Sequence, residues 1–218
     1  MNITQVYLTL DYDTSDQDKR VEYQIGNTYI QLFIEECLRK NKHDFGAFNR
    51  LVFSEGGDVA GDFHIVGNSA FDVAVDDTYS KLETLKTNRE IHNYYISKFL
   101  EGFKKLDSHF KSSFVEYLTP LLEEKYKKEL YYEKKIASKV IKGHKVQVDS
   151  RYEREFFKLF VNIYHKKQLV KSEIIFQCEP DMFITKYEVN KVFIEEEKIT
   201  ILNKIRETSI EYDLGGVL

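Results

Sequence analysis

Proline, glycine, cysteine and tryptophan are scarce in this chain of 218 residues. It contains 2 Pro, 10 Gly, 2 Cys and no Trp. So few Pro and Gly residues exclude a collagen-like, linker-like or low-complexity chain. Cys37 and Cys178 lie far apart and form no CxxC pair, which argues against a zinc knuckle, a redox motif and a disulfide framework. We expect two reduced, buried thiols in a cytoplasmic protein.

Long hydrophobic runs are also absent. The longest stretch without Asp, Glu, Lys or Arg runs from Tyr23 to Ile34, whereas a membrane-spanning helix needs about 20 apolar residues. The first residues show neither the basic start nor the apolar core of a secretory signal. We therefore expect a cytoplasmic protein with no membrane partner.

The common signatures of catalysis and cofactor binding are missing as well. The sequence contains no GxGxxG, GxxxxGK[ST], HxH or HExxH, the motifs of dinucleotide, nucleotide and metal sites. Residues 67–71 begin like a GxSxG nucleophile elbow, but Phe71 replaces the last glycine,. We assign no catalytic residue, expect no cofactor and no resident metal, and lean away from an enzyme.

Apolar residues alternate in the N-terminal third, which predicts strands. Residues 6–12 and 21–25 both have a period of two, and the polar segment 13–19 between them predicts a hairpin,. Thr28 and Gln31 form a capping-box pattern for a helix that ends near Asn41. Three short strands are expected next, at 51–53, 63–65 and 71–75.

From about Asp77 the apolar residues recur at helical spacing, and the alternation typical of strands returns in the last third. Ser80 with Glu83 predicts the start of one long helix, and Thr119 with Pro120 the start of another,. Residues 192–202 predict a hairpin. Strands on both sides of a helical block indicate an α+β fold with largely antiparallel sheets. We expect a single domain, 1–218, with an acidic β-rich part at 1–77, a centre of two or three helices at 78–130 and an antiparallel β part at 131–218.

Charge is distributed unevenly along the chain, although the formal net charge is only −4. Residues 1–78 contain 14 Asp and Glu against six Lys and Arg, and the rest contains 22 against 26. Acidic loops of this kind either keep a protein soluble or steer a basic partner towards it. The residues predicted to contact a partner are Asp11, Asp13, Asp16, Asp18, Glu55, Asp58 and Asp62.

These traits predict a non-enzymatic, cytoplasmic protein that binds a basic protein partner through an acidic surface. A bacterial immunity protein that neutralises a toxin domain is one specific form of this function. The alternative is a small hydrolase, with or without a metal, that uses Asp58, Asp62, His64 and Asp72, because Asp62 and His64 share one face of a short strand. The same residues can equally form the polar outer face of a hairpin sheet.

Residues 125–145 combine Lys and Tyr, as nucleic-acid-binding surfaces do,. Interleaved Glu residues and only seven Arg in the whole chain argue against that function, because phosphate recognition favours Arg,. A solvated helix face joined to a strand is the commoner origin of such a segment. We do not expect nucleic acid as a partner, but Tyr126, Tyr131 and Tyr132 remain a candidate contact surface.

Overall fold

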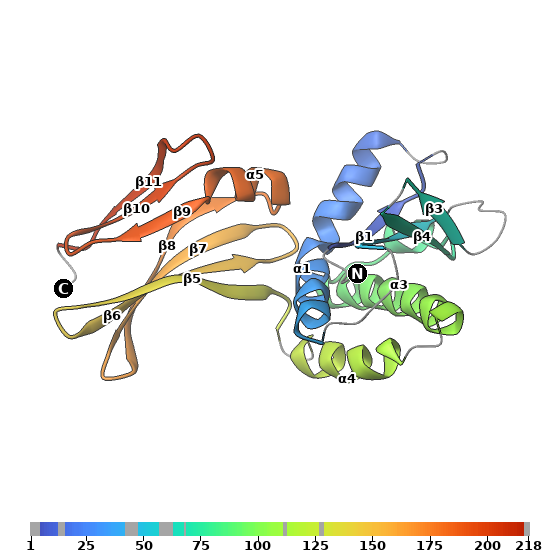
Figure 1. The fold of residues 1–218 in the computed structure, drawn as a ribbon, viewed down its shortest axis with the longest axis horizontal. Helices are drawn as coiled ribbons and strands as arrows, with labels where there is room; N and C mark the ends of the chain where they lie inside the picture. The colour runs from blue at the N-terminus through green and yellow to red at the C-terminus, as the bar shows by residue number, and fades with distance from the viewer. Residues whose placement is uncertain are drawn as a thin grey trace. The chain divides into compact units, whose positions relative to one another are not determined.

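The computed structural model describes residues 5–12, 16–41, 48–56, 63–67, 69–110, 113–126 and 129–215. The chain forms two compact units, Met1–Leu130 and Tyr131–Leu218, drawn in Figure 1. Their boundary falls where the sequence predicts the C-terminal β part to begin. The predicted α+β class is confirmed, with 37% helix and 40% strand. That the 218 residues act as a single domain stays a prediction.

A four-stranded sheet in the order β1-β2-β4-β3 forms the base of the N-terminal unit. β1 is parallel to β2 and β2 is parallel to β4, whereas β3 is antiparallel to β4. The parallel pair β1 and β2 requires a crossover, which helix α1 provides. The carboxyl ends of β1, β2 and β4 therefore meet at one edge of the sheet. The bounds are β1 (Gln5–Leu10), α1 (Gln17–Asn41), β2 (Arg50–Glu55), β3 (Phe63–Val66) and β4 (Ala70–Val75).

The second strand predicted at residues 21–25 is wrong, because this segment lies in the second turn of α1. The buried residues Tyr23, Asn27, Ile30 and Ile34 recur at helical spacing, and five residues are too few to distinguish that stripe from alternation. Thr28 is likewise inside the helix, where its hydroxyl donates to the carbonyl four residues earlier at 3.0 Å. The predicted end of the helix at Asn41 is confirmed.

The central helical block is confirmed, but its helices begin at other residues than predicted. A capping box starts α3 at Thr87 and Glu90: the Thr87 N–H donates to the Glu90 carboxylate at 2.9 Å, and the Glu90 N–H donates to the Thr87 hydroxyl at 3.2 Å,. Asp107 accepts from the N–H groups of the first two residues of α4. Pro120 lies inside α4, not at its first position as predicted. The bounds are α2 (Tyr79–Leu82), α3 (Asn88–Phe110) and α4 (Phe114–Tyr126).

The core of the N-terminal unit is aromatic where α3 meets the sheet. The Phe53 ring on β2 lies 4.9 Å from the Phe103 ring, centroid to centroid, at a steep angle. Gly102 allows this contact, because a Cβ atom built on it would come within 2.3 Å of the Phe53 ring. The glycine is therefore a packing requirement of the helix–sheet interface.

The C-terminal unit contains two antiparallel sheets, in the orders β5-β6-β7-β8 and β11-β10-β9. The predicted hairpin at 192–202 is confirmed as β9 and β10. Buried residues alternate along β6 and β7, as in Val146, Val148, Leu159 and Val161. The bounds are β5 (Tyr132–Ile141), β6 (His144–Tyr152), β7 (Phe157–His165), β8 (Gln168–Cys178), α5 (Met182–Glu188), β9 (Lys191–Ile194), β10 (Lys198–Leu202) and β11 (Thr208–Asp213).

The two cysteines differ in exposure. Cys37 is buried as expected, but Cys178 is only half-buried, at the end of β8. The expectation of a second buried thiol is therefore wrong. Desolvation raises the pKa of both thiols to about 11, so both are protonated at neutral pH and are poor nucleophiles. In the described parts of the chain, no helix has the length and apolarity needed to cross a membrane.

Gly102→Ala tests the close approach of α3 to the sheet. We expect the free energy of unfolding to fall by about 1–3 kcal/mol, because the added methyl group must displace the Phe53 ring. Urea denaturation measures the effect, and Lys104→Ala on the exposed side of the same helix is the control. Equal stability of the two variants would contradict the tight packing.

Candidate functional site

Acidic residues gather where β1, β2 and β4 end. The strand register aligns Leu10 with Glu55, and Glu55 with Val75. Asp11 therefore follows β1 on one side of Glu55, and Asp76 follows β4 on the other. The Asp11 N–H donates to the Glu55 carbonyl at 2.8 Å, which holds the end of β1 against β2.

The first turns of α1 bring further carboxylates to the same edge. Asp16 lies just before the helix and accepts a hydrogen bond from the N–H of Asp18 at 2.7 Å, as an N-cap does. The Lys19 ammonium lies 5.5 Å from the centre of the Tyr79 ring, so the start of α1 adjoins the start of α2. We define the carboxyl edge as Asp11, Asp16, Asp18, Asp76 and Asp77; all are exposed except Asp11, which is half-buried.

Three of the seven predicted partner contacts belong to the carboxyl edge: Asp11, Asp16 and Asp18. A further three, Asp13, Asp58 and Asp62, lie outside the described residues. Asp76 and Asp77 are not among the predicted contacts. Their position directly after a predicted strand is the only signal in the sequence, and it is insufficient, because the ends of β1 and β4 meet at one edge through parallel pairing with β2, whereas the predicted sheet is largely antiparallel.

Glu55 points into the protein, so its predicted role as an exposed contact is wrong. The residue is only 1% exposed. Its carboxylate accepts hydrogen bonds from the hydroxyl groups of Tyr23 and Tyr94. It also accepts from the N–H of Thr78 at 2.8 Å and from the Thr78 hydroxyl at 3.1 Å. The Lys98 ammonium lies 3.7 Å from the same carboxylate.

The surroundings of Glu55 fix the protonation of its partners. Burial, together with the adjacent carboxylate, raises the pKa of both Tyr23 and Tyr94 well above 10, so both phenols remain hydrogen-bond donors. Lys98 also donates to the carbonyl of Asp76 at 2.6 Å and to the Glu101 carboxylate at 3.2 Å. A buried charge with this many partners is stabilised where it lies, so the Glu55 network is a structural element beneath the carboxyl edge.

The structure describes two of the four residues of the hydrolase hypothesis and brings them together. His64 on β3 is directly opposite Asp72 on β4. The Ser54 hydroxyl, which the sequence did not indicate, donates to the Asp72 carboxylate at 2.7 Å. Burial raises the pKa of Asp72, while the Ser54 hydrogen bond and His64 oppose the shift. Among the described residues, no group of three or more His, Cys, Asp or Glu could hold a metal ion, and the hydrolase stays a prediction.

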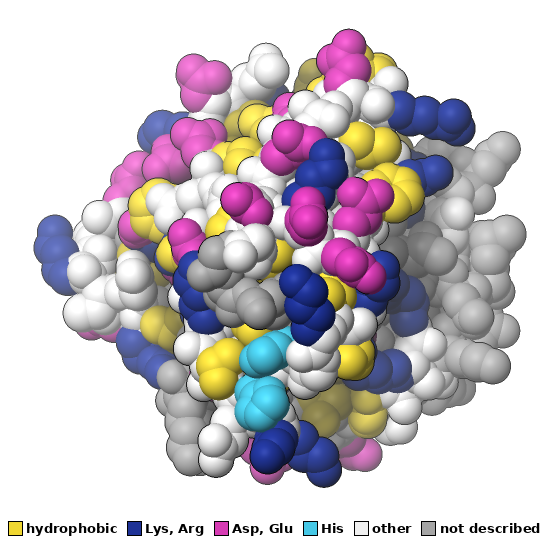
Figure 2. Space-filling model, turned by 90° about the vertical axis from the view of Figure 1, so that its left-hand side faces the viewer, with side chains coloured by type: hydrophobic (Ala, Val, Ile, Leu, Met, Phe, Trp, Pro, Cys, Tyr) yellow, Lys and Arg dark blue, Asp and Glu magenta, His cyan; other side chains and the backbone are white. Residues whose placement is uncertain are grey.

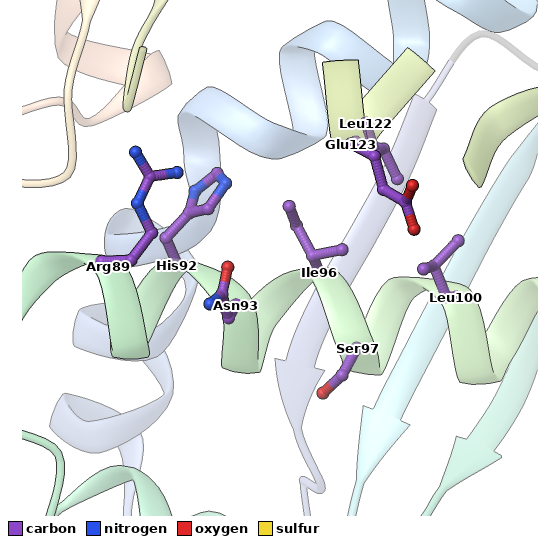
Figure 3. Close-up of a pocket in the computed structure, with 8 residues that line it drawn as sticks. All are labelled: Arg89, His92, Asn93, Ile96, Ser97, Leu100, Leu122 and Glu123. Atoms are coloured by element: carbon purple, nitrogen blue, oxygen red, sulfur yellow. The ribbon is translucent and has the colours of Figure 1, made fainter. Parts of the chain in front are cut away.

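A pocket of about 430 Å³ opens between α3 and α4. Figure 3 shows Arg89 and His92 towards one end of it and Glu123 on α4 towards the other. The His92 Nδ1 atom lies 2.8 Å from the Tyr29 hydroxyl, and desolvation lowers the pKa of His92 to about 4, which leaves the imidazole neutral at pH 7. The remaining lining residues are Asn93, Ile96, Ser97, Leu100 and Leu122.

Comparisons with known proteins add no function to this picture. No protein-family model, no curated protein and no solved structure matches the chain. The class that the described residues define is an α+β protein with an acidic edge on its N-terminal sheet.

Removing the Glu55 carboxylate tests whether the network supports the N-terminal unit. We expect Glu55→Ala to lower the free energy of unfolding by about 3 kcal/mol, because the buried ammonium and two phenols lose their acceptor. Glu22→Ala, on an exposed position of α1, is the control and should change stability by less than about 0.5 kcal/mol. A loss below about 1 kcal/mol at position 55 would contradict the structural role.

The buried imidazole of His92 predicts a pH-dependent stability. Its pKa is about 4 in the folded protein against 6.5 ordinarily, so below pH 6.5 the unfolded chain binds a proton that the folded chain does not. The neutral imidazole therefore contributes fully to the free energy of unfolding above pH 6.5. This contribution decreases by about 3 kcal/mol in total as the pH falls towards 4. Denaturation of the wild type and of His92→Gln between pH 7 and 4 measures it. An identical slope in both proteins would show that another group is responsible.

Proposed function

We propose that the N-terminal unit binds a basic protein partner through the carboxyl edge. The observation that carries the proposal is the parallel register of β1, β2 and β4. It brings the carboxylates that follow β1 and β4 to one edge of the sheet, and the start of α1 adds Asp16 and Asp18. A cluster of exposed negative charges attracts a basic surface during encounter and disfavours acidic partners.

Tyr12 adds an aromatic contact beside these charges. Tyr12 directly follows Asp11 and is 79% exposed. The Arg20 guanidinium lies 4.5 Å from the centre of its ring and donates to its carbonyl at 3.0 Å, so the side chain is held at the end of β1. Exposed Tyr residues next to charged residues are frequent energetic centres of protein interfaces.

The buried network under the edge supports binding by a preformed surface. Glu55 joins the end of β2 to α1 through Tyr23, to the start of α2 through Thr78, and to α3 through Tyr94. Charges held in place before binding lose less conformational freedom when the complex forms. The specific partner that we favour within this proposal is a basic toxin domain, with the chain as its immunity protein.

Charge reversal at the start of α1 tests the proposal. Asp18 belongs to the carboxyl edge, and Glu22 is exposed one helical turn further along α1, so Asp18→Lys/Glu22→Lys reverses one charge at the edge and one next to it without touching the Glu55 network. The tagged full chain captures proteins from the source cells at low and high salt, and a captured basic protein is then purified and titrated. We expect binding that weakens with salt and a Kd about tenfold higher for the double variant.

The matched control is Glu196→Lys/Glu197→Lys, which makes the same charge change in the C-terminal unit. Both positions are exposed, and the Kd of this variant should remain close to that of the wild type. The proposal fails if no basic protein is captured at either salt concentration. It also fails if the captured protein binds both double variants with the wild-type Kd.

A further inference from the structure

Lysines occupy the tight turns of two hairpins in the C-terminal unit. Lys142 and Gly143 join β5 to β6 with φ of 46° and 79°, and Lys166 and Lys167 join β7 to β8 with φ of 47° and 71°. Two positive φ angles in a two-residue loop characterise the type I′ turn, which normally contains Asn and Gly. Side chains rarely tolerate this backbone, and such strain is concentrated at functional sites.

The two turns lie side by side. His144, the first residue of β6, is paired with His165, the last residue of β7, and the centres of their rings are 4.8 Å apart. Figure 2 looks onto this end of the unit and shows histidine side chains together, with Lys or Arg side chains beside them. We define the basic tip as Lys142, His144, Lys145, His165, Lys166 and Lys167.

The basic tip has no acidic residues near it in the sequence. Residues 134–148 contain five Lys and residues 156–172 contain four, and neither stretch contains Asp, Glu or Arg. The four lysines of the tip are exposed. Positive charges concentrated in this way repel one another, and an external anionic surface relieves that repulsion.

A row of two exposed aliphatic residues, one lysine and one tyrosine crosses the sheet next to the turns. The register aligns Val140, Lys145, Tyr164 and Leu169 on four neighbouring strands, so their side chains share one face. Val140 is 70% exposed and Leu169 is 54% exposed. The Lys145 ammonium lies 5.3 Å from the centre of the Tyr164 ring. Aliphatic side chains thus flank an aromatic ring and a cation, as at membrane interfaces.

We propose that the basic tip docks on an anionic lipid surface, with Val140 and Leu169 entering the interface between headgroups and acyl chains. The exposed aliphatic side chains of Val140 and Leu169 favour a lipid over a nucleic acid, because nucleic-acid surfaces use stacking aromatics and Arg. Docking of this kind needs no membrane-spanning helix. The expectation of no membrane partner stays a prediction that this docking would contradict, and the proposal is independent of the carboxyl edge.

Acidic residues on the neighbouring sheet determine which side of the unit faces the bilayer in this proposal. Glu195, Glu196 and Glu197 are exposed between β9 and β10, and Glu211 is exposed on β11. Figure 2 shows Asp and Glu side chains gathered on another part of the same face as the histidines. An anionic bilayer repels these acidic residues and attracts the basic tip. The sheet formed by β5 to β8 therefore faces the bilayer.

Sedimentation of the full chain with vesicles tests the docking. The vesicles contain phosphatidylcholine alone or phosphatidylcholine with about one third phosphatidylserine. We expect binding to the anionic vesicles only, and weaker binding at high salt. Lys142→Glu/Lys167→Glu should weaken it about 30-fold or more, and Val140→Ser/Leu169→Ser about tenfold.

Lys191→Glu/Lys204→Glu is the matched control, because both lysines are exposed elsewhere in the same unit; its binding should stay near that of the wild type. Circular dichroism confirms that each variant is folded. Absence of binding to anionic vesicles at low salt would overturn the proposal, as would unchanged binding of the Val140→Ser/Leu169→Ser variant. Titration with fluorescent duplex RNA and DNA is the second arm, and tip-dependent binding there without vesicle binding assigns the surface to nucleic acid instead.

Discussion

The N-terminal unit depends on one buried carboxylate. Glu55 ends the central strand β2, and its hydrogen bonds and ion pair reach α1, the start of α2 and α3. Removing a charged group from water is unfavourable unless hydrogen bonds and ion pairs compensate. The carboxylate of Glu55 is therefore stable only when α1, the start of α2 and α3 are all packed around it. The constraint positions the ends of β1 and β4, and with them the carboxylates that lie around Glu55 on the surface.

Two surfaces of opposite charge follow from the local architecture of the two units. In the N-terminal unit, parallel strands collect the acidic residues that follow them. In the C-terminal unit, two antiparallel hairpins bring their lysine turns together, because His144 is in register with His165. The net charge of −4 for the whole chain conceals both features, since it averages over surfaces of opposite sign.

The sequence predicts the α+β class, most of the strands and the end of α1, because period-two and helical patterns of sufficient length are unambiguous. It does not reveal the α1 segment at 21–25, where a short alternation coincides with a helical stripe. Nor does it reveal the burial of Glu55, which lies beside Gly56 in a segment typical of an exposed turn. Its partners Tyr94 and Lys98 are about 40 residues away in the sequence, and such pairings arise only from the tertiary fold.

The central claim is that the buried Glu55 network holds the carboxyl edge in place. Amide hydrogen exchange tests it most directly, in the wild type and in Glu55→Ala under conditions where both are folded. The account predicts that two amides exchange at least about tenfold faster in the variant. The Thr78 N–H loses its acceptor on the Glu55 side chain, and the Asp11 N–H, which donates to the Glu55 main-chain carbonyl, lies at a strand end that the network no longer holds. The strands of the C-terminal unit keep their protection. Wild-type exchange rates at both amides in the variant would contradict the claim.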